Sequence, residues 1–248
     1  YALCGNVGTI DLAREAGLLP VGGFGLNITN GEALAFFADR GLAAATLSME
    51  LTFRQTAFAA DRPLPVGLLV YGRQPLMLTR NCPRRSAGQH CEGAPNAACG
   101  LTDRRGVTFP LACAGGCAEL LNSVPLYWAD RLEEVPRLDF WLLHFSTESP
   151  EEVENLTRAY HRGGAAMDGI TRGLYKRGVE EIQGSKNEQP PFGRPLVLVC
   201  SYYFPVLSPK THCTSKETVL PVRLSTRRRV RVMVSPTLYL VNSVRMAA

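Results

Sequence analysis

The stretch from residue 70 to residue 125 constrains this chain more than any other, because it holds five of the eight cysteines. The five are Cys82, Cys91, Cys99, Cys113 and Cys117. Glycine, proline and asparagine separate them, which predicts a set of tight loops without a long helix. The apolar content between the first and third of these cysteines is too thin for a hydrophobic core. The stretch therefore needs a cross-link, either disulfides or thiolates bound to a metal or cluster.

The spacing of the cysteines bears on which cross-link it is. The intervening segments contain eight, seven, thirteen and three residues, so no C-x-x-C pair occurs and a zinc ribbon or finger is disfavoured. Loosely spaced thiolates on a glycine-rich backbone suit an iron–sulfur cluster, whose ligands come from separate loops. Disulfides need an oxidising compartment, of which the sequence gives no sign. The alternative is that these cysteines are buried apolar residues, which fits Cys117 best because it begins the amphipathic segment CAELLNS.

Outside this stretch, apolar segments alternate with amphipathic ones at a period of roughly 20–25 residues. The predicted strands are apolar throughout, as expected of parallel strands buried on both faces. We expect strands at 2–7, 20–28, 43–48, 65–71, 107–112 and 138–145, and helices at 9–17, 30–41, 49–61, 125–134 and 149–160. This succession predicts an α/β fold, either a βα barrel or a doubly wound sheet.

The formal net charge of +5 belongs to the C-terminal segment. Residues 1–180 contain 17 Lys and Arg against 19 Asp and Glu, whereas residues 181–248 contain 10 against 3. A near-neutral body argues against nucleic-acid binding through a basic domain. After Glu180 the composition changes to a linker and then to sequence rich in Val, Ser, Thr, Pro and Arg. We interpret residues 181–248 either as a poorly ordered or frame-shifted extension, or as a short β module or basic arm for RNA.

No segment approaches the roughly 18–20 apolar residues of a membrane span, and no secretory signal is visible. These patterns predict a cytoplasmic protein with no membrane partner. The chain opens at Tyr1 in strand-like sequence, so we expect the N-terminal part of the domain to be missing.

The search for catalytic groups identifies no nucleophile. His144 lies in an apolar strand, where it is either a substrate-binding residue at a barrel mouth or a satisfied core histidine. Glu50 follows a strand end, where barrel enzymes keep their working residues, or it simply starts a helix. The TRG and KRG steps of residues 171–178 are expected to present Arg172, Lys176 and Arg177 at one mouth. There is no G-x-S-x-G elbow, H-E-x-x-H motif or P-loop.

Several segments in order resemble the U32 peptidase family, the collagenase-like proteases of bacteria. They are GFGLNITN (23–30), TLSMELT (46–52), LPVGLLVYGRQPLMLTRNCP (64–83), GLTDRRGVTFPL (100–111), LLNSVPLYWADRL (120–132) and TRGLYKRGVE (171–180). The resemblance covers residues 2–180 and implies the C-terminal part of a TIM-barrel-like catalytic domain. Family members are classed as peptidases, and related members support hydroxylation of tRNA, of ribosomal RNA or of the ubiquinone ring.

The resemblance also implies a 4Fe-4S cluster bound by four cysteines, which match Cys82, Cys91, Cys99 and Cys113 here. Where many members have an earlier cysteine, this chain has Pro75, and Cys117 is an alternative for one of the four ligands. Zinc is the alternative metal.

Together these patterns predict a partial TIM-barrel-like (β/α) domain over residues 1–180 with a cysteine-rich loop insertion, followed by a linker and irregular tail over 181–248. The predicted function is hydrolysis of peptide bonds by a U32-family peptidase. The alternatives are an iron–sulfur protein that supports hydroxylation of tRNA or rRNA, and a zinc-stapled binding module without catalysis. The expected substrate is accordingly a peptide or an RNA.

Overall fold

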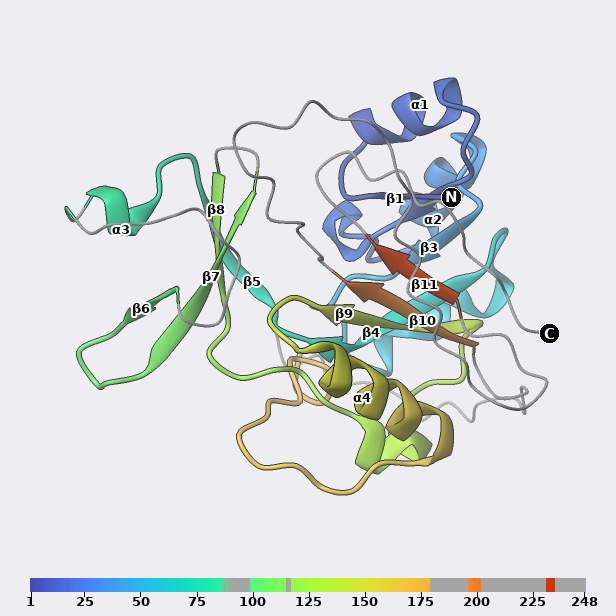
Figure 1. Cartoon of the computed structure of the whole chain (residues 1–248). Helices are drawn as coiled ribbons and strands as arrows, with labels where there is room; N and C mark the ends of the chain where they lie inside the picture. Colours follow the sequence, from blue (N-terminus) through green and yellow to red (C-terminus); the bar gives the residue numbers. More distant parts are fainter. Residues whose placement is uncertain (87, 89–98, 115–116, 179–195, 202–230, 235–248) are drawn as a thin grey trace.

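The structure of the protein is a computed structural model that describes residues 1–86, 88, 99–114, 117–178, 196–201 and 231–234. It is a mixed α/β fold in which a parallel sheet curls into a half-barrel and a second, antiparallel sheet projects from it (Figure 1). The parallel strands, in their spatial order, are β1 (Ala2–Cys4), β2 (Pro20–Gly22), β3 (Ala44–Thr46), β4 (Val66–Gly72), β9 (Phe140–Phe145), β10 (Leu196–Ser201) and β11 (Arg231–Val234).

Helices connect most of these strands, as the period of the sequence predicts. They are α1 (Gly8–Glu15), α2 (Gly31–Asp39) and α4 (Pro150–Arg162), with the 3-10 helices η1 (Phe24–Leu26), η2 (Gln55–Asp61) and η3 (Ala129–Glu134). Two of the predicted helix starts are confirmed by their caps. The Asn30 side chain accepts a hydrogen bond from the Ala33 amide, and Ser149 forms a capping box with Glu152 at the start of α4.

The helices predicted over 49–61 and 125–134 were wrong in type and extent, because only short 3-10 helices form there. In the first case Thr52 and Gln55 exchange side-chain hydrogen bonds with each other's backbone amides, which holds a turn ahead of η2. In the second case Trp128 is fully buried and its backbone is non-helical. The backbone of Arg131 is also non-helical and interrupts η3. Tertiary packing of one large side chain overrides the helical pattern here.

The half-barrel has two distinct faces, which the strand register defines. Thr46 pairs with Gly67 and Gly67 with Phe140, so these positions share one face, and alternation adds Leu142 and His144 to it. We call this the inner face. Tyr71 lies on the other face, where its ring contacts Tyr160 of α4. This outer face is therefore the one that α4 covers (Figure 1).

A β-bulge in β4 links the sheet to the segments that pack on it. The register between β4 and β9 shifts between Leu69 and Tyr71. The Tyr175 hydroxyl donates to the Leu69 carbonyl at 2.7 Å, and the Tyr160 hydroxyl donates to the Val70 carbonyl at 2.6 Å. Because a bulge disrupts the ladder locally, these two buried hydroxyls supply hydrogen bonds to the carbonyl groups beside it.

The antiparallel sheet, which we call the arm, spans residues 75–121. Its strands, in spatial order, are β5 (Pro75–Thr79), β8 (Cys117–Leu121), β7 (Thr108–Ala114) and β6 (Gly100–Thr102), and a short helix α3 (Pro83–Ser86) follows β5. The strand predicted at 107–112 is confirmed, but the prediction of loops elsewhere in this stretch was wrong for β5, β6 and β8. Their pairing buries Cys99, Leu111 and Ala118 in a small second core, which the sequence concealed because it is shared among separate strands.

Two short strands of the C-terminal segment, β10 and β11, continue the parallel sheet beyond β9. The linker and the other residues of that segment lie outside the described part of the chain, so the division at residue 180 stays a prediction. Within the described ranges no helix has the length and apolar character needed to cross a membrane.

Candidate functional site

The arm is attached at the carboxyl end of the parallel sheet, where α/β proteins place their working residues. Only two residues separate β4 from β5, and the returning chain pairs with β4 again through two hydrogen bonds between Gly72 and Leu126. Arg73 secures this attachment. Its guanidinium donates to the Thr147 hydroxyl at 3.2 Å and to the Asn122 carbonyl at 3.0 Å, and it also contacts the Ser123 carbonyl. The arm is thus tied to the end of β9 as well as to β4.

The register of the arm places the cysteines relative to one another. The Leu111 amide donates to the Cys99 carbonyl, and Cys113 follows two residues later on β7, so positions 99 and 113 share a face. Cys113 pairs with Ala118, whereas Cys117 pairs with Ala114. Position 117 therefore lies on the opposite face, as alternation along β8 requires. This arrangement disfavours Cys117 as a replacement ligand.

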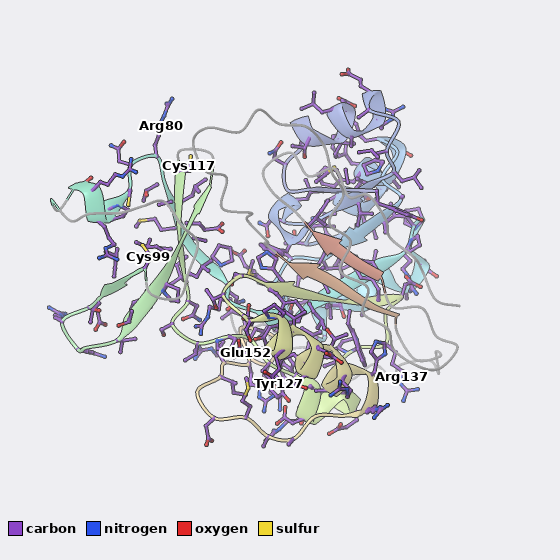
Figure 2. The ribbon with its side chains drawn as sticks, viewed as in Figure 1. Arg80, Cys99, Cys117, Tyr127, Arg137 and Glu152 are labelled. Carbon is purple, nitrogen blue, oxygen red and sulfur yellow. The ribbon has the colours of Figure 1, made fainter. Side chains whose placement is uncertain are left out.

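Cys82 lies three residues beyond the end of β5, directly before α3. The Thr79 hydroxyl donates to the carbonyls of Asn81 and Ala118, and Ala118 is the cross-strand partner of Cys113. Cys82 follows directly and is half-buried at the start of α3, where its carbonyl accepts the Ser86 amide. Positions 99 and 113 thus share a face of the arm, whereas Cys82 lies beyond β5, just before α3 (Figure 2 labels Cys99 and Cys117).

Thiolates are the donors that iron–sulfur clusters prefer. Cys91 lies outside the described residues, and of Cys113 the structure gives the backbone position. Among the side chains that the structure does describe, no three His, Cys, Asp or Glu groups are close enough together to hold a metal ion. The predicted ligand set accordingly stays a prediction, supported by the shared face of positions 99 and 113.

The inner face of the half-barrel carries the second group of candidate residues. His144 lies near the end of β9 and is buried, with the ring of Phe24 packed edge-on at 5.4 Å. Burial lowers the pKa of His144 to about 4, so its imidazole is neutral at pH 7. The burial favours the interpretation of a core histidine over that of an exposed substrate-binding group.

The pKa of His144 makes the stability of the protein depend on pH. In the unfolded chain a histidine titrates near pH 6.5, so between pH 6.5 and 4 the unfolded state takes up a proton that the folded state excludes. The stabilisation is complete above pH 6.5, and we expect it to fall by roughly 3 kcal/mol as the pH drops to 4. Chemical denaturation at several pH values measures this loss. A H144Q variant should flatten the curve, whereas H161Q, which changes an exposed histidine of α4, should leave the decline in place.

The 3-10 helix η1 connects His144 to the polar residues at the end of β3. Phe24 begins η1, and Asn27 ends it in the left-handed conformation, with φ 50°. The Ser48 hydroxyl donates to the Asn27 side-chain oxygen at 2.5 Å and accepts the Glu50 amide at 3.2 Å. Asn27 is one of the residue types that adopt this conformation at low cost, yet a non-glycine residue there is uncommon and marks a constrained turn.

Glu50 itself is exposed beside this turn, so it is available to a substrate at the carboxyl edge. Two of the three basic residues predicted at a mouth, Arg172 and Lys176, form ion pairs instead. Arg172 forms an ion pair with Asp130 at 2.7 Å, which by its hydrogen bond lowers the pKa of that carboxyl group, and Lys176 pairs with Glu134 at 2.5 Å. Both cations lie over the ring of Trp128 and fix residues 171–178 against η3.

Comparison of the chain with protein families, with curated proteins and with solved structures finds no match.

Sequence reasoning missed Arg73, Asn27 and the hydrogen bonds of Tyr71. The Tyr71 hydroxyl donates to the Glu148 carboxylate, whose other oxygen accepts the backbone amides of Ser146 and Thr147. Burial and then the charge of Glu148 raise the pKa of Tyr71, so the phenol stays protonated. The available signal was their position near strand ends, which gather at one edge: Tyr71 lies near the end of β4, Arg73 directly follows it, and Asn27 follows β2 and η1.

Proposed function

We propose that this chain is the C-terminal part of a U32-peptidase-like domain, a collagenase-like protease that hydrolyses peptide bonds and carries a 4Fe-4S cluster in its arm. One observation carries the proposal. The segment LPVGLLVYGRQPLMLTRNCP, the most specific of the resembling motifs, forms in one run the parallel strand β4, the edge strand β5 and the turn that presents Cys82. Barrel strand, arm and cysteine are therefore one continuous unit at the carboxyl edge.

In this proposal the four thiolates of Cys82, Cys91, Cys99 and Cys113 hold the cluster. A bound iron–sulfur cluster supplies one-electron transfer or structural cross-linking, according to its ligands and exposure. The chain's own residues position it: Arg73 ties the base of the arm to Thr147, and the Thr79 hydroxyl holds the turn before Cys82. Substrate would be bound between the arm and the polar residues after β3, where Glu50 is exposed.

The peptidase activity is tested by incubating the purified protein, prepared without oxygen, with gelatin and with a library of labelled peptides. We expect cleavage that E50Q lowers at least about tenfold, since an exposed carboxylate at a barrel mouth is the best-placed general base. The matched control is E151Q, which changes an exposed acid in the first turn of α4. Absence of cleavage in protein with its cysteines intact would contradict the proposal.

The second candidate is an iron–sulfur protein that supports hydroxylation of tRNA or rRNA. It is favoured by the sequence itself, which offers a set of thiolates but no recognised nucleophile motif. A protein that lacks peptidase activity, contains iron and sulfide, and restores a missing hydroxyl group in RNA from deficient cells would support this candidate. A zinc-stapled module without catalysis is the third, and metal analysis separates it from the other two.

A further inference from the structure

Strand β5 is an edge of the arm with an exposed apolar centre. In the described sheet it pairs on one side only, with β8. Its three central residues Leu76, Met77 and Leu78 are 53%, 46% and 70% exposed. Because side chains alternate along a strand, these three residues expose apolar surface on both faces of the edge.

Such an edge is a template for another strand, and native proteins usually protect it with charged residues, proline or β-bulges that prevent pairing. Among the residues that the structure describes, the protection is confined to the ends. Pro75 and a register shift before Met77 interrupt the start of β5, and Arg80 follows its end. The centre carries no charge, so a partner strand can approach it.

The charge of the arm indicates what kind of strand it would accept. Residues 75–121 contain five arginines and three acidic residues, although residues 1–180 as a whole have an acidic excess. Arg80 is exposed and extends away from the arm next to β5, as Figure 2 shows. Glu119 is the cross-strand partner of Leu78, and burial raises the pKa of its carboxyl group. The edge thus combines an apolar centre with a positive end.

We propose that β5 binds an extended segment of a partner protein by strand addition, and that this segment has an apolar centre flanked by acidic residues. Backbone hydrogen bonds to the edge of β5 that the described sheet leaves unpaired would supply affinity, and the apolar and acidic side chains would supply selectivity. A second copy of this chain is disfavoured, because pairing two arms brings their excess positive charges together. Single-stranded RNA is disfavoured, because the exposed side chains of β5 are aliphatic and offer no aromatic ring for base stacking. The inference needs neither the cluster nor hydrolysis.

The test uses a fluorescein-labelled peptide of three valines flanked on each side by two glutamates, whose binding to the full chain is measured by anisotropy. We expect saturable binding that protects residues 75–79 from hydrogen exchange. L78Q should weaken it about tenfold, because one apolar side chain loses its contact. R80Q should weaken it less, by about threefold, and reduce its dependence on salt.

Matched controls lie at the other side of the arm. Val107 and Arg105 are exposed in the turn between β6 and β7, so V107Q and R105Q remove the same kinds of group without touching β5. Both should bind the peptide as the wild type does. A peptide with lysine for glutamate, or with proline for the central valine, should not bind. Equal binding of the lysine peptide, an unchanged affinity in L78Q, tighter binding of single-stranded RNA, or a dimer in sedimentation that L78Q dissociates would each overturn the inference.

Discussion

Changing Cys99 to serine is expected to remove most of the iron and sulfide from protein prepared without oxygen, together with its brown colour. Cys99 is buried beside Leu111 and Ala118, and its position shares a face of the arm with Cys113. A serine hydroxyl is a far poorer ligand for iron than a thiolate, so loss of one of four ligands should release the cluster or convert it to a smaller one. Iron and sulfide analysis with a visible spectrum measures the effect.

Two other cysteines serve as controls for Cys99. C117S changes a thiol at a position on the opposite face of the arm, and C4S changes a buried thiol of β1 whose Sγ lies near the Thr9 carbonyl. Both proteins should keep the iron and sulfide of the wild type. Colourless, iron-free wild-type protein would contradict the presence of a cluster. One zinc per chain would indicate a structural zinc site instead. Loss of iron in C117S but not in C99S would show that Cys117 is a ligand and that Cys99 is not.

The second large effect is expected at Tyr160, whose change to phenylalanine should lower the free energy of unfolding by about 3 kcal/mol. The Tyr160 hydroxyl is buried, accepts the Trp128 amide at 2.8 Å and donates to the Val70 carbonyl at 2.6 Å. Its removal leaves two buried backbone groups without these bonds, at a cost of about 1–3 kcal/mol each. It also loosens the attachment of α4 and η3 to the bulge in β4. Urea denaturation followed by circular dichroism measures the difference.

Two other tyrosines, Tyr175 and Tyr127, serve as comparisons for this prediction. Tyr175 makes one buried hydrogen bond, to the Leu69 carbonyl, so Y175F should cost about half as much as Y160F. Tyr127 donates to the Ala165 carbonyl in a partly exposed position, and Y127F should cost less than about 1 kcal/mol. Each variant keeps the aromatic ring, so the losses should differ only through the hydrogen bonds removed. Equal losses for all three variants would contradict the prediction.

The sequence located the parallel strands β1 to β4 and β9, because an uninterrupted apolar run such as LDFWLLHF is typical of a strand buried on both faces. It did not locate β10 and β11. It did locate α2 and α4, since their caps at Asn30 and Ser149 are local features. It failed at the helix predicted over 125–134, where burial of Trp128 decides the backbone. It also failed at β5, whose exposed Leu76 to Leu78 form a strand only because β8 lies beside them.

The candidate site, like the fold, could be predicted from the sequence only in part. Residue types and spacing indicated a cross-linked cysteine stretch and excluded the common nucleophile motifs, whereas the choice of four cysteines as ligands came from the resemblance. They left open how the cysteines lie relative to one another, because that depends on pairing between β7 and β8 and on a turn held by Thr79. Arg73 and Tyr71 were missed for the same reason, since their partners lie on the return from the arm and beyond β9.

By itself, then, the sequence determined the alternation of apolar strands with capped helices and the concentration of thiols in one stretch, since both follow from local chemistry. Only the tertiary structure decided that this stretch is an antiparallel arm, that position 117 lies on the face opposite to positions 99 and 113, and that β5 is an edge strand among the described residues. These features depend on which strands pair and in what register. A register is fixed by contacts between residues distant in sequence, which no local pattern specifies.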